Sequence, residues 1–201
     1  MSNSFFTPFK VLFCFIIVII LFVSLFFIPQ YPNLAISSNT LNSNGNYIID
    51  ISSSGYAWPT PGYTHITSYF GYRRSPTAGA SSYHSGLDIG APEGSKLIAT
   101  TSGEITFTGF LGGGGYTITL TSGNMKFTYC HVSPIYIVKE GDIVVQGQVI
   151  GYVGPKYVYG VKGNQYTDEK GRPTNGATTG PHLHFGLRIN GNYVDPLSLF
   201  P

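Results

Sequence analysis

The chain begins with one long apolar stretch, and the rest alternates short apolar runs with turn residues. The stretch from Val11 to Ile28 carries no charge and is interrupted only by Cys14 and Ser24. At about 1.5 Å per residue, a helix of this length approaches the ~30 Å hydrocarbon core of a bilayer. It exceeds the roughly 7–15 apolar residues of a cleaved signal peptide, and no small-x-small cleavage site follows it. These features favour one retained transmembrane signal anchor at residues 11–28 over a cleaved signal.

The basic residues near this stretch set its orientation. Lys10 precedes it, and the next Lys or Arg along the chain is Arg73. The positive-inside rule therefore predicts a cytoplasmic N-terminus at residues 1–10 and an extracytoplasmic remainder. Residues 29–57 are rich in Asn, Ser, Ile and Pro, and Asp50 is their only charge. This composition predicts a flexible extracytoplasmic linker that ends where the patterned region begins, near Trp58.

From Trp58 onward the apolar runs have the length and spacing of β-strands. They contain many β-branched and aromatic residues and are bounded by Gly, Pro, Asn and Asp. The runs are Ile66–Phe70, Lys96–Thr100, Glu104–Phe110, Tyr116–Thr121, Lys126–His131, Ile143–Val145, Val149–Val153, His182–Ile189 and Tyr193–Val194. No segment shows a sustained helical period, and short connections favour hairpins. We therefore expect a mostly β domain built on an antiparallel sheet over residues 58–201.

Composition supports this picture and excludes some partners. Charged residues make up 10% of the chain and aromatic residues 15%, with 26 glycines, a balance typical of a β-rich domain with many turns. The net charge is +2 and there is no basic run, so the sequence gives no sign of nucleic-acid binding.

Cys14 and Cys130 are predicted to lie in different phases, one in the membrane and one outside it, which argues against a disulfide between them. The four glycines at 112–115 are followed by neither a helix start nor a Lys, so they predict a hairpin turn rather than a phosphate loop.

Four of the five histidines fall into short motifs, and each motif alone has an ordinary structural explanation. In a strand, His182 and His184 would share one face, with Leu183 in the core, but two surface histidines would fit equally well. His84 and Asp88 are separated by Ser-Gly and followed by Gly-Ala-Pro, so an extended or turning segment, not a helix, would have to bring them together. Two imidazoles and one carboxylate form a donor set that suits Zn²⁺.

The remaining histidine of the pattern, His131, follows an apolar run. Strand alternation predicts that Tyr129 and His131 share a face and that Cys130 points into the core. His131 would then reach a cleft, although a buried, hydrogen-bonded histidine is the alternative. The fifth histidine, His65, has no place in the pattern and is expected to be structural or on the surface.

Taken in order and with their flanks, these motifs resemble the lysostaphin/LytM-type zinc endopeptidases. That family's pattern is His-x-x-x-Asp, a later His after an aromatic-x pair, and a C-terminal His-x-His. The resemblance covers residues 58–201. Its matching segments are 66–73, 84–92, 141–151, 179–185 and 194–196, of which Thr-Gly-Pro-His-Leu-His-Phe at 179–185 is the most specific.

The resemblance implies one zinc ion per domain, with His84, Asp88 and His184 as ligands. It implies that His131 and His182 are catalytic histidines that do not bind the metal, and that zinc-activated water attacks a scissile peptide carbonyl. The implied substrates are peptide stems or bridges of bacterial peptidoglycan. Together with the anchor, this predicts a single-pass cell-membrane protein whose C-terminal domain works on the cell-wall side.

Two features depart from the family, and two other functions compete with this interpretation. Cys130 stands where the family commonly has a small Ala. The irregular segment 155–181 is also long, and this segment either borders the site or is a surface insertion. One competing function is a catalytically silent module of the same fold that binds the wall or activates hydrolases. The other is a phosphocarrier or lipoyl-type carrier, which would not need Asp88 and His184. The presence of all five site residues favours the enzyme.

Overall fold

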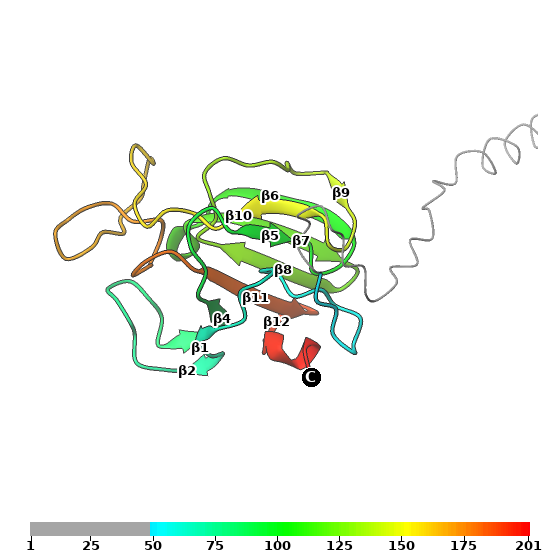
Figure 1. The fold of residues 1–201 in the computed structure, drawn as a ribbon. Helices are drawn as coiled ribbons and strands as arrows, with labels where there is room; N and C mark the ends of the chain where they lie inside the picture. Colours follow the sequence, from blue (N-terminus) through cyan, green and yellow to red (C-terminus); the bar gives the residue numbers. More distant parts are fainter. Residues whose placement is uncertain (1–48) are drawn as a thin grey trace, which may run out of the picture. The chain divides into compact units, whose positions relative to one another are not determined.

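The computed structural model describes residues 49–201, so the predicted anchor, the cytoplasmic N-terminus and most of the predicted linker lie outside the described residues. Within the described range, no helix is long and apolar enough to cross a membrane. This part of the chain is mostly antiparallel β-structure (Figure 1), as the short apolar runs predicted.

One large sheet organises the domain, and two small strand pairs accompany it. In spatial order the sheet contains β1 (Ile66–Ser68), β4 (Gly86–Ile89), β11 (Leu183–Ile189), β8 (Met125–Cys130), β7 (Tyr116–Ser122), β6 (Gly103–Phe110) and β9 (Ile143–Val144), and β12 (Asn192–Val194) also pairs with β11. The small pairs are β5 (Lys96–Ile98) with β10 (Val149–Tyr152) and β2 (Gly71–Tyr72) with β3 (Tyr83–His84). Two short 3₁₀ turns, η1 (Gly112–Gly114) and η2 (Pro196–Leu199), complete the elements.

Every strand that the apolar pattern predicted is present, with ends shifted by no more than two residues. The four-glycine turn connects β6 to β7, so it is a hairpin turn as expected. The pattern missed β2, β3 and β4. These strands are only two to four residues long, and the Ser-Gly pair at 85–86 interrupts their apolar character. The missed region carries His84 and Asp88.

Strand alternation gives the large sheet one buried face and one open face. On β11, Leu183, Phe185 and Leu187 are fully buried, while the residues between them point the other way. Phe127 of β8 stacks on Phe185, with the ring centroids 6.1 Å apart. Burial of each such side chain contributes about 1.5–3 kcal/mol to folding. The core therefore fixes which face of β11 presents its histidine.

The last nine residues of the predicted linker contact the domain. Ala57 is fully buried, and its amide donates to the carbonyl of Thr100 at 2.9 Å. Ile51 forms an isolated bridge with Ala57, and the ring of Tyr56 lies 6.2 Å from that of Phe127, centroid to centroid. The part of this segment that the structure describes is thus packed on the sheet.

Candidate metal centre

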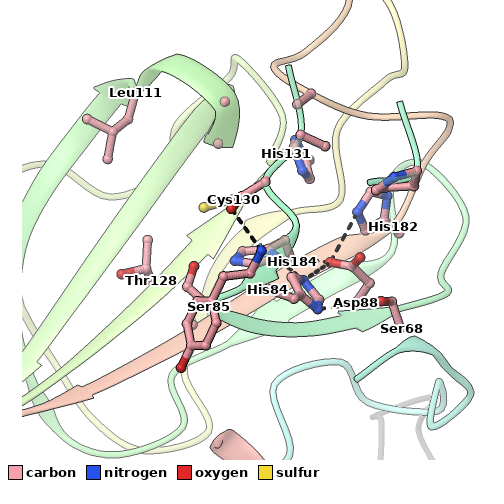
Figure 2. A pocket seen from close by; sticks show the side chains of 18 of the residues that line it. Ser68, His84, Ser85, Asp88, Leu111, Thr128, Cys130, His131, His182 and His184 are labelled. Carbon is pink, nitrogen blue, oxygen red and sulfur yellow. Dashed lines mark hydrogen bonds and ion pairs between the residues drawn. The ribbon is translucent and has the colours of Figure 1, made fainter. Parts of the chain in front are cut away.

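Three side chains from two neighbouring strands and one small strand pair converge on a single point. The antiparallel register of β4 and β11 places His184 directly opposite Asp88, and His84 ends β3. Nε2 of His84 lies 3.0 Å from Oδ1 of Asp88 and 2.9 Å from Nδ1 of His184. That same Nδ1 lies 2.9 Å from Oδ1 of Asp88. Figure 2 shows the three groups pointing toward one another, and together they form a group that could hold a metal ion.

The chemistry of these donors fits a divalent metal. Nδ1 of His84 lies 2.7 Å from the carbonyl oxygen of Tyr69, which can only accept, so Nδ1 of the neutral imidazole is the donor. Its Nε2 then faces the carboxylate as a second acceptor, and two acceptors this close repel unless a cation lies between them. Two imidazole nitrogens and one carboxylate oxygen are a common zinc donor set that leaves a fourth position open. His84 is 2% exposed and Asp88 8%, so little solvent competes for them.

Arg73 holds the other oxygen of Asp88. Its Nη1 lies 2.8 Å from Oδ2 and also donates to Oγ of Ser68. Burial alone would raise the pKa of Asp88, but the side chains of His182, His184 and His84 gathered around its carboxylate outweigh this effect and hold the pKa far below its usual range. The carboxylate is therefore ionised at neutral pH, with Oδ2 occupied by Arg73 and Oδ1 facing the histidines.

His182 and His131 stand beside this cluster and share one geometry. Nδ1 of His182 donates to the carbonyl of Gly180 at 2.8 Å, and Nδ1 of His131 donates to the carbonyl of Asn175 at 2.7 Å. Both hydrogen bonds fix the tautomer and leave Nε2 as the atom able to exchange a proton. The two rings lie 4.7 Å apart, centroid to centroid, and Nε2 of His182 is 3.6 Å from Oδ1 of Asp88.

His131 reaches the site by a different route from the predicted one. The expectation that Tyr129 and His131 share a face is wrong, and Cys130, although buried as expected, lies on the groove face of β8 rather than on its core face. Tyr129 is fully buried and donates its hydroxyl to Oγ1 of Thr100, whereas Cys130 pairs with His184 and lines the groove. β8 ends at Cys130, and His131 adopts a positive φ of 58°, so strand alternation no longer applies to it.

Burial sets the protonation states of His131 and Cys130. Burial, with help from the neighbouring His182 and His184, lowers the pKa of His131 to about 3. Burial raises the pKa of Cys130 to about 12. At neutral pH His131 is therefore an uncharged imidazole, the form that can accept a proton. Cys130 is a protonated thiol, which suits an inert packing residue.

The segment 155–181 borders the site, which decides between the two interpretations of its length. Asn175 is fully buried. Its backbone carbonyl accepts from His131, and its side chain accepts from the Tyr116 amide at 2.7 Å and donates to the Val132 carbonyl at 3.0 Å. Tyr166 of the same segment packs against Gly79, from the loop that enters β3. The segment therefore both supports His131 and contacts the opposite wall.

The cluster opens into a groove of about 960 Å³. The walls come from the loop between β2 and β3, from the turn at η1 and from residues 177–181, and the floor is the open face of the sheet. His65 does not line it: its side chain is exposed, and its carbonyl accepts from the Gly90 amide. A groove of this volume, with the open face of the sheet as its floor, has room for an extended peptide.

Sequence reasoning gave no role to Arg73 or Asn175. Arg73 lies in the matching segment 66–73, and a pair of adjacent arginines, Arg73 and Arg74, in a chain with only 10% charged residues was the available signal. For Asn175 no local signal exists, because its partners Tyr116, Val132 and His131 lie more than 40 residues away.

Comparison with known proteins identifies the family. Residues 82–196, more than half of the chain, match peptidase family M23. The chain is 37% identical over 138 residues to the DD-carboxypeptidase/endopeptidase Mpg of Neisseria meningitidis serogroup B, covering 68% of this chain and 27% of that protein. It is 29% identical over 137 residues to the peptidoglycan DD-endopeptidase ShyB of Vibrio cholerae, covering 67% and 28%. The chain thus spans about a quarter of the length of these curated relatives.

Solved structures give the same result. A zinc-containing peptidase from Vibrio cholerae superposes with a TM-score of 0.53 at 26% identity, covering 75% of this chain and 40% of that one. Lysostaphin from Staphylococcus simulans superposes with a TM-score of 0.52 at 28% identity, covering 68% and 49%. The resemblance to lysostaphin/LytM-type peptidases is confirmed by both comparisons, and the chain belongs to peptidase family M23.

Proposed function

We propose that this chain is a membrane-anchored, zinc-dependent endopeptidase that hydrolyses peptide cross-links of bacterial peptidoglycan. The observation that carries the proposal is the arrangement of five side chains. Three donor atoms, from His84, Asp88 and His184, lie within 3.0 Å of one another. Beside them, His131 and His182 each have Nδ1 held by a backbone carbonyl. A catalytically silent module has no need of two histidines fixed in this way.

In this proposal, zinc bound by His84, Asp88 and His184 would act as a Lewis acid and lower the pKa of a water molecule. His131, uncharged and with Nδ1 fixed as a donor, accepts a proton from the attacking water at Nε2. That proton is later delivered to the nitrogen of the leaving amine. His182, in its protonated form, donates a hydrogen bond from Nε2 to the carbonyl oxygen as that oxygen gains negative charge, while its Nδ1 stays bound to Gly180. Arg73, bound to Oδ2, keeps the Asp88 carboxylate oriented throughout.

The place of action also belongs to the proposal. The apolar residues 11–28, preceded by Lys10, support a single-pass anchor with the domain outside the membrane. The relatives support the substrate, because ShyB is a peptidoglycan DD-endopeptidase and Mpg a DD-carboxypeptidase/endopeptidase. A domain tethered on the outer side of the membrane by residues 29–48 would have the cell wall within reach.

Zymography tests this function. The full chain, purified in mild detergent, is run in a gel containing purified peptidoglycan and is renatured with zinc. Clearing is expected, with release of new free amino groups and no new reducing sugar ends. The Asp88→Ala variant serves as the inactive control. If the wild-type protein with zinc supplied gives no clearing, the silent-module alternative gains and the endopeptidase proposal fails.

A further inference from the structure

The groove extends well beyond the metal centre along the open face of the sheet. On β11, alternation places His184, Gly186 and Arg188 on this face. On β8 their register partners are Cys130, Thr128 and Lys126. All six residues line the groove. In Figure 2, Thr128 lies on the side of the cluster away from His182. The ligand His184 and the pair Lys126–Arg188 thus mark two ends of one continuous floor.

Between these ends the floor of the groove is formed by residues with small side chains or none. Gly186 has no side chain, and a Cβ added there would lie 3.6 Å from Cβ of Thr128 and 3.9 Å from Nε2 of His184. The next strand contributes Thr119, which pairs with Thr128. Small side chains over two neighbouring strands leave room for an extended peptide to lie against the sheet.

The far end of the floor is positively charged, and its guanidinium is held in place. Arg188 stacks on the ring of Tyr193, 4.2 Å from its centroid, and donates to the Tyr193 hydroxyl. Lys126 is exposed directly beside it. Within residues 49–201 neither cation forms an ion pair. The nearest acid in the same row is Glu104, two strands away across Thr121, and it does not line the groove.

The charges along the groove are unbalanced. Its lining contains four cationic side chains, and its single carboxylate, Asp88, is already bound by Arg73. The cationic residues are Arg73, Arg74, Lys126 and Arg188. Two adjacent cations with no acidic partner suit a carboxylate on the ligand, and a fixed guanidinium can bind it through two parallel hydrogen bonds.

The spacing along the strand sets where that carboxylate must be. Arg188 lies four positions after His184 on β11, which corresponds to roughly 13 Å along the strand. An extended peptide in the groove advances about 3.3 Å per residue, and Arg and Lys side chains reach back several ångströms along the floor. The carboxylate would therefore lie about two to three residues from the bond at the metal centre.

We propose that Lys126 and Arg188 form a carboxylate-binding subsite that makes this domain selective for anionic peptides, with a free carboxylate two to three residues from the cleaved bond. This inference rests on the proposed function, because the reference point is the bond hydrolysed at His84, Asp88 and His184. Selectivity arises because a carboxylate would neutralise the pair, whereas a carboxamide would leave both cations unneutralised.

The test uses two synthetic cross-linked stem peptides of the same sequence. One carries free carboxylates, and the other carries carboxamides at the same positions. The full chain with zinc is compared with the K126Q/R188Q variant, with R188K, which keeps the charge, and with K139Q, an exposed lysine outside the groove. We measure kcat and KM. Binding of both peptides is measured separately by fluorescence anisotropy in the His131→Ala variant, with and without the double substitution.

For the wild type we expect at least a tenfold preference for the carboxylate peptide, expressed in KM and in binding. The preference for the carboxylate peptide should disappear in K126Q/R188Q. It should persist fully in K139Q and for the most part in R188K. If both peptides are cleaved equally well, or if the double variant weakens both equally, the subsite is wrong while the endopeptidase proposal stands. If neither peptide is cleaved but the carboxylate peptide still binds through the pair, the endopeptidase proposal fails and the subsite stands.

Discussion

Arg73 binds the oxygen of Asp88 that does not face the histidines. Nη1 of Arg73 is 2.8 Å from Oδ2, while Oδ1 is 2.9 Å from Nδ1 of His184. The pair is only partly accessible, with 21% of the arginine side chain and 12% of the aspartate side chain exposed. Because a carboxylate rotates about its last bond, this ion pair limits Asp88 to the orientation in which Oδ1 joins the cluster.

Substitution of Arg73 is therefore expected to weaken metal binding without removing a ligand. We predict that Arg73→Gln lowers zinc affinity roughly 10- to 100-fold, as for other groups that orient metal ligands. Competition with a chromophoric chelator measures this directly and independently of catalysis. Arg74→Gln is the matched control, because Arg74 also lines the groove but is exposed. Unchanged zinc affinity in Arg73→Gln would show that Asp88 is oriented without the ion pair.

The two kinds of histidine should separate in a metal assay. His84→Ala and Asp88→Ala are expected to lose zinc and activity together, because each removes one of three ligands. His131→Ala should retain zinc at close to the wild-type content, while kcat falls by about 10²–10⁴, the usual contribution of a general acid or base. Metal analysis of the purified variants alongside kinetics tests both statements. Full turnover in His131→Ala would remove its role as a proton acceptor.

Much of this arrangement was predictable, and the part that was not depends on contacts distant in sequence. The alternating apolar runs predicted the strands, since each run must bury one face. The meeting of Asp88 and His184, 96 residues apart, is set by the register between β4 and β11. A single sequence does not reveal that register, and the family resemblance supplied the grouping instead.

The failure at Cys130 and His131 has a local physical cause. Alternation assumes that the strand continues, but β8 ends one residue before His131, where the backbone turns to a φ of +58°. The Asn175 carbonyl 44 residues later stabilises this turn by accepting from Nδ1 of His131. Neither the turn nor its partner leaves a periodic signal in the sequence.

Asn175 links the long segment to the site, and its loss should affect both stability and turnover. In Asn175→Ala the Tyr116 amide and the Val132 carbonyl lose their partners in a buried place. Each unpaired group costs about 1–3 kcal/mol of unfolding free energy. Urea unfolding followed by fluorescence measures that loss. Because the segment also positions His131, kcat should fall more than KM rises. Asn164→Ala, in the same segment, is the control for a general loss of order in residues 155–181.

Two glycines on neighbouring strands should respond in opposite ways to the same substitution. A Cβ at Gly86 would overlap the carbonyl oxygen of Phe185, whereas at Gly186 it would meet nothing closer than 3.6 Å. Gly86→Ala is therefore expected to unfold or strongly destabilise the domain. Gly186→Ala should keep the wild-type melting temperature within a few degrees but raise KM, because its methyl group lies on the groove floor. Calorimetry and kinetics on the pair separate these effects, and an unchanged KM would argue against peptide binding on this floor.

The segment 155–181 should lose its order in acid. Asp168 accepts hydrogen bonds from Arg172 and from the Tyr157 hydroxyl. Desolvation raises the pKa of Asp168, but the hydrogen bonds from Arg172, Tyr157 and Lys170 together outweigh it and lower the pKa well below its ordinary value of 3.8. A depressed pKa stabilises the folded segment above about pH 4, and this stabilisation is lost as the pH falls further, because the unfolded chain then binds the proton more readily.

The order of the segment can be measured by its rate of cleavage by pepsin, which is active at acidic pH. Cleavage within residues 157–172 should be slow at pH 4 and accelerate as the pH is lowered toward 2. Asp168→Asn cannot form the ion pair with Arg172 and should be cut rapidly already at pH 4. Glu169→Gln is the matched control, since Glu169 is exposed beside it. Equal cleavage of wild type and Asp168→Asn at pH 4 would show that the carboxylate does not order the segment.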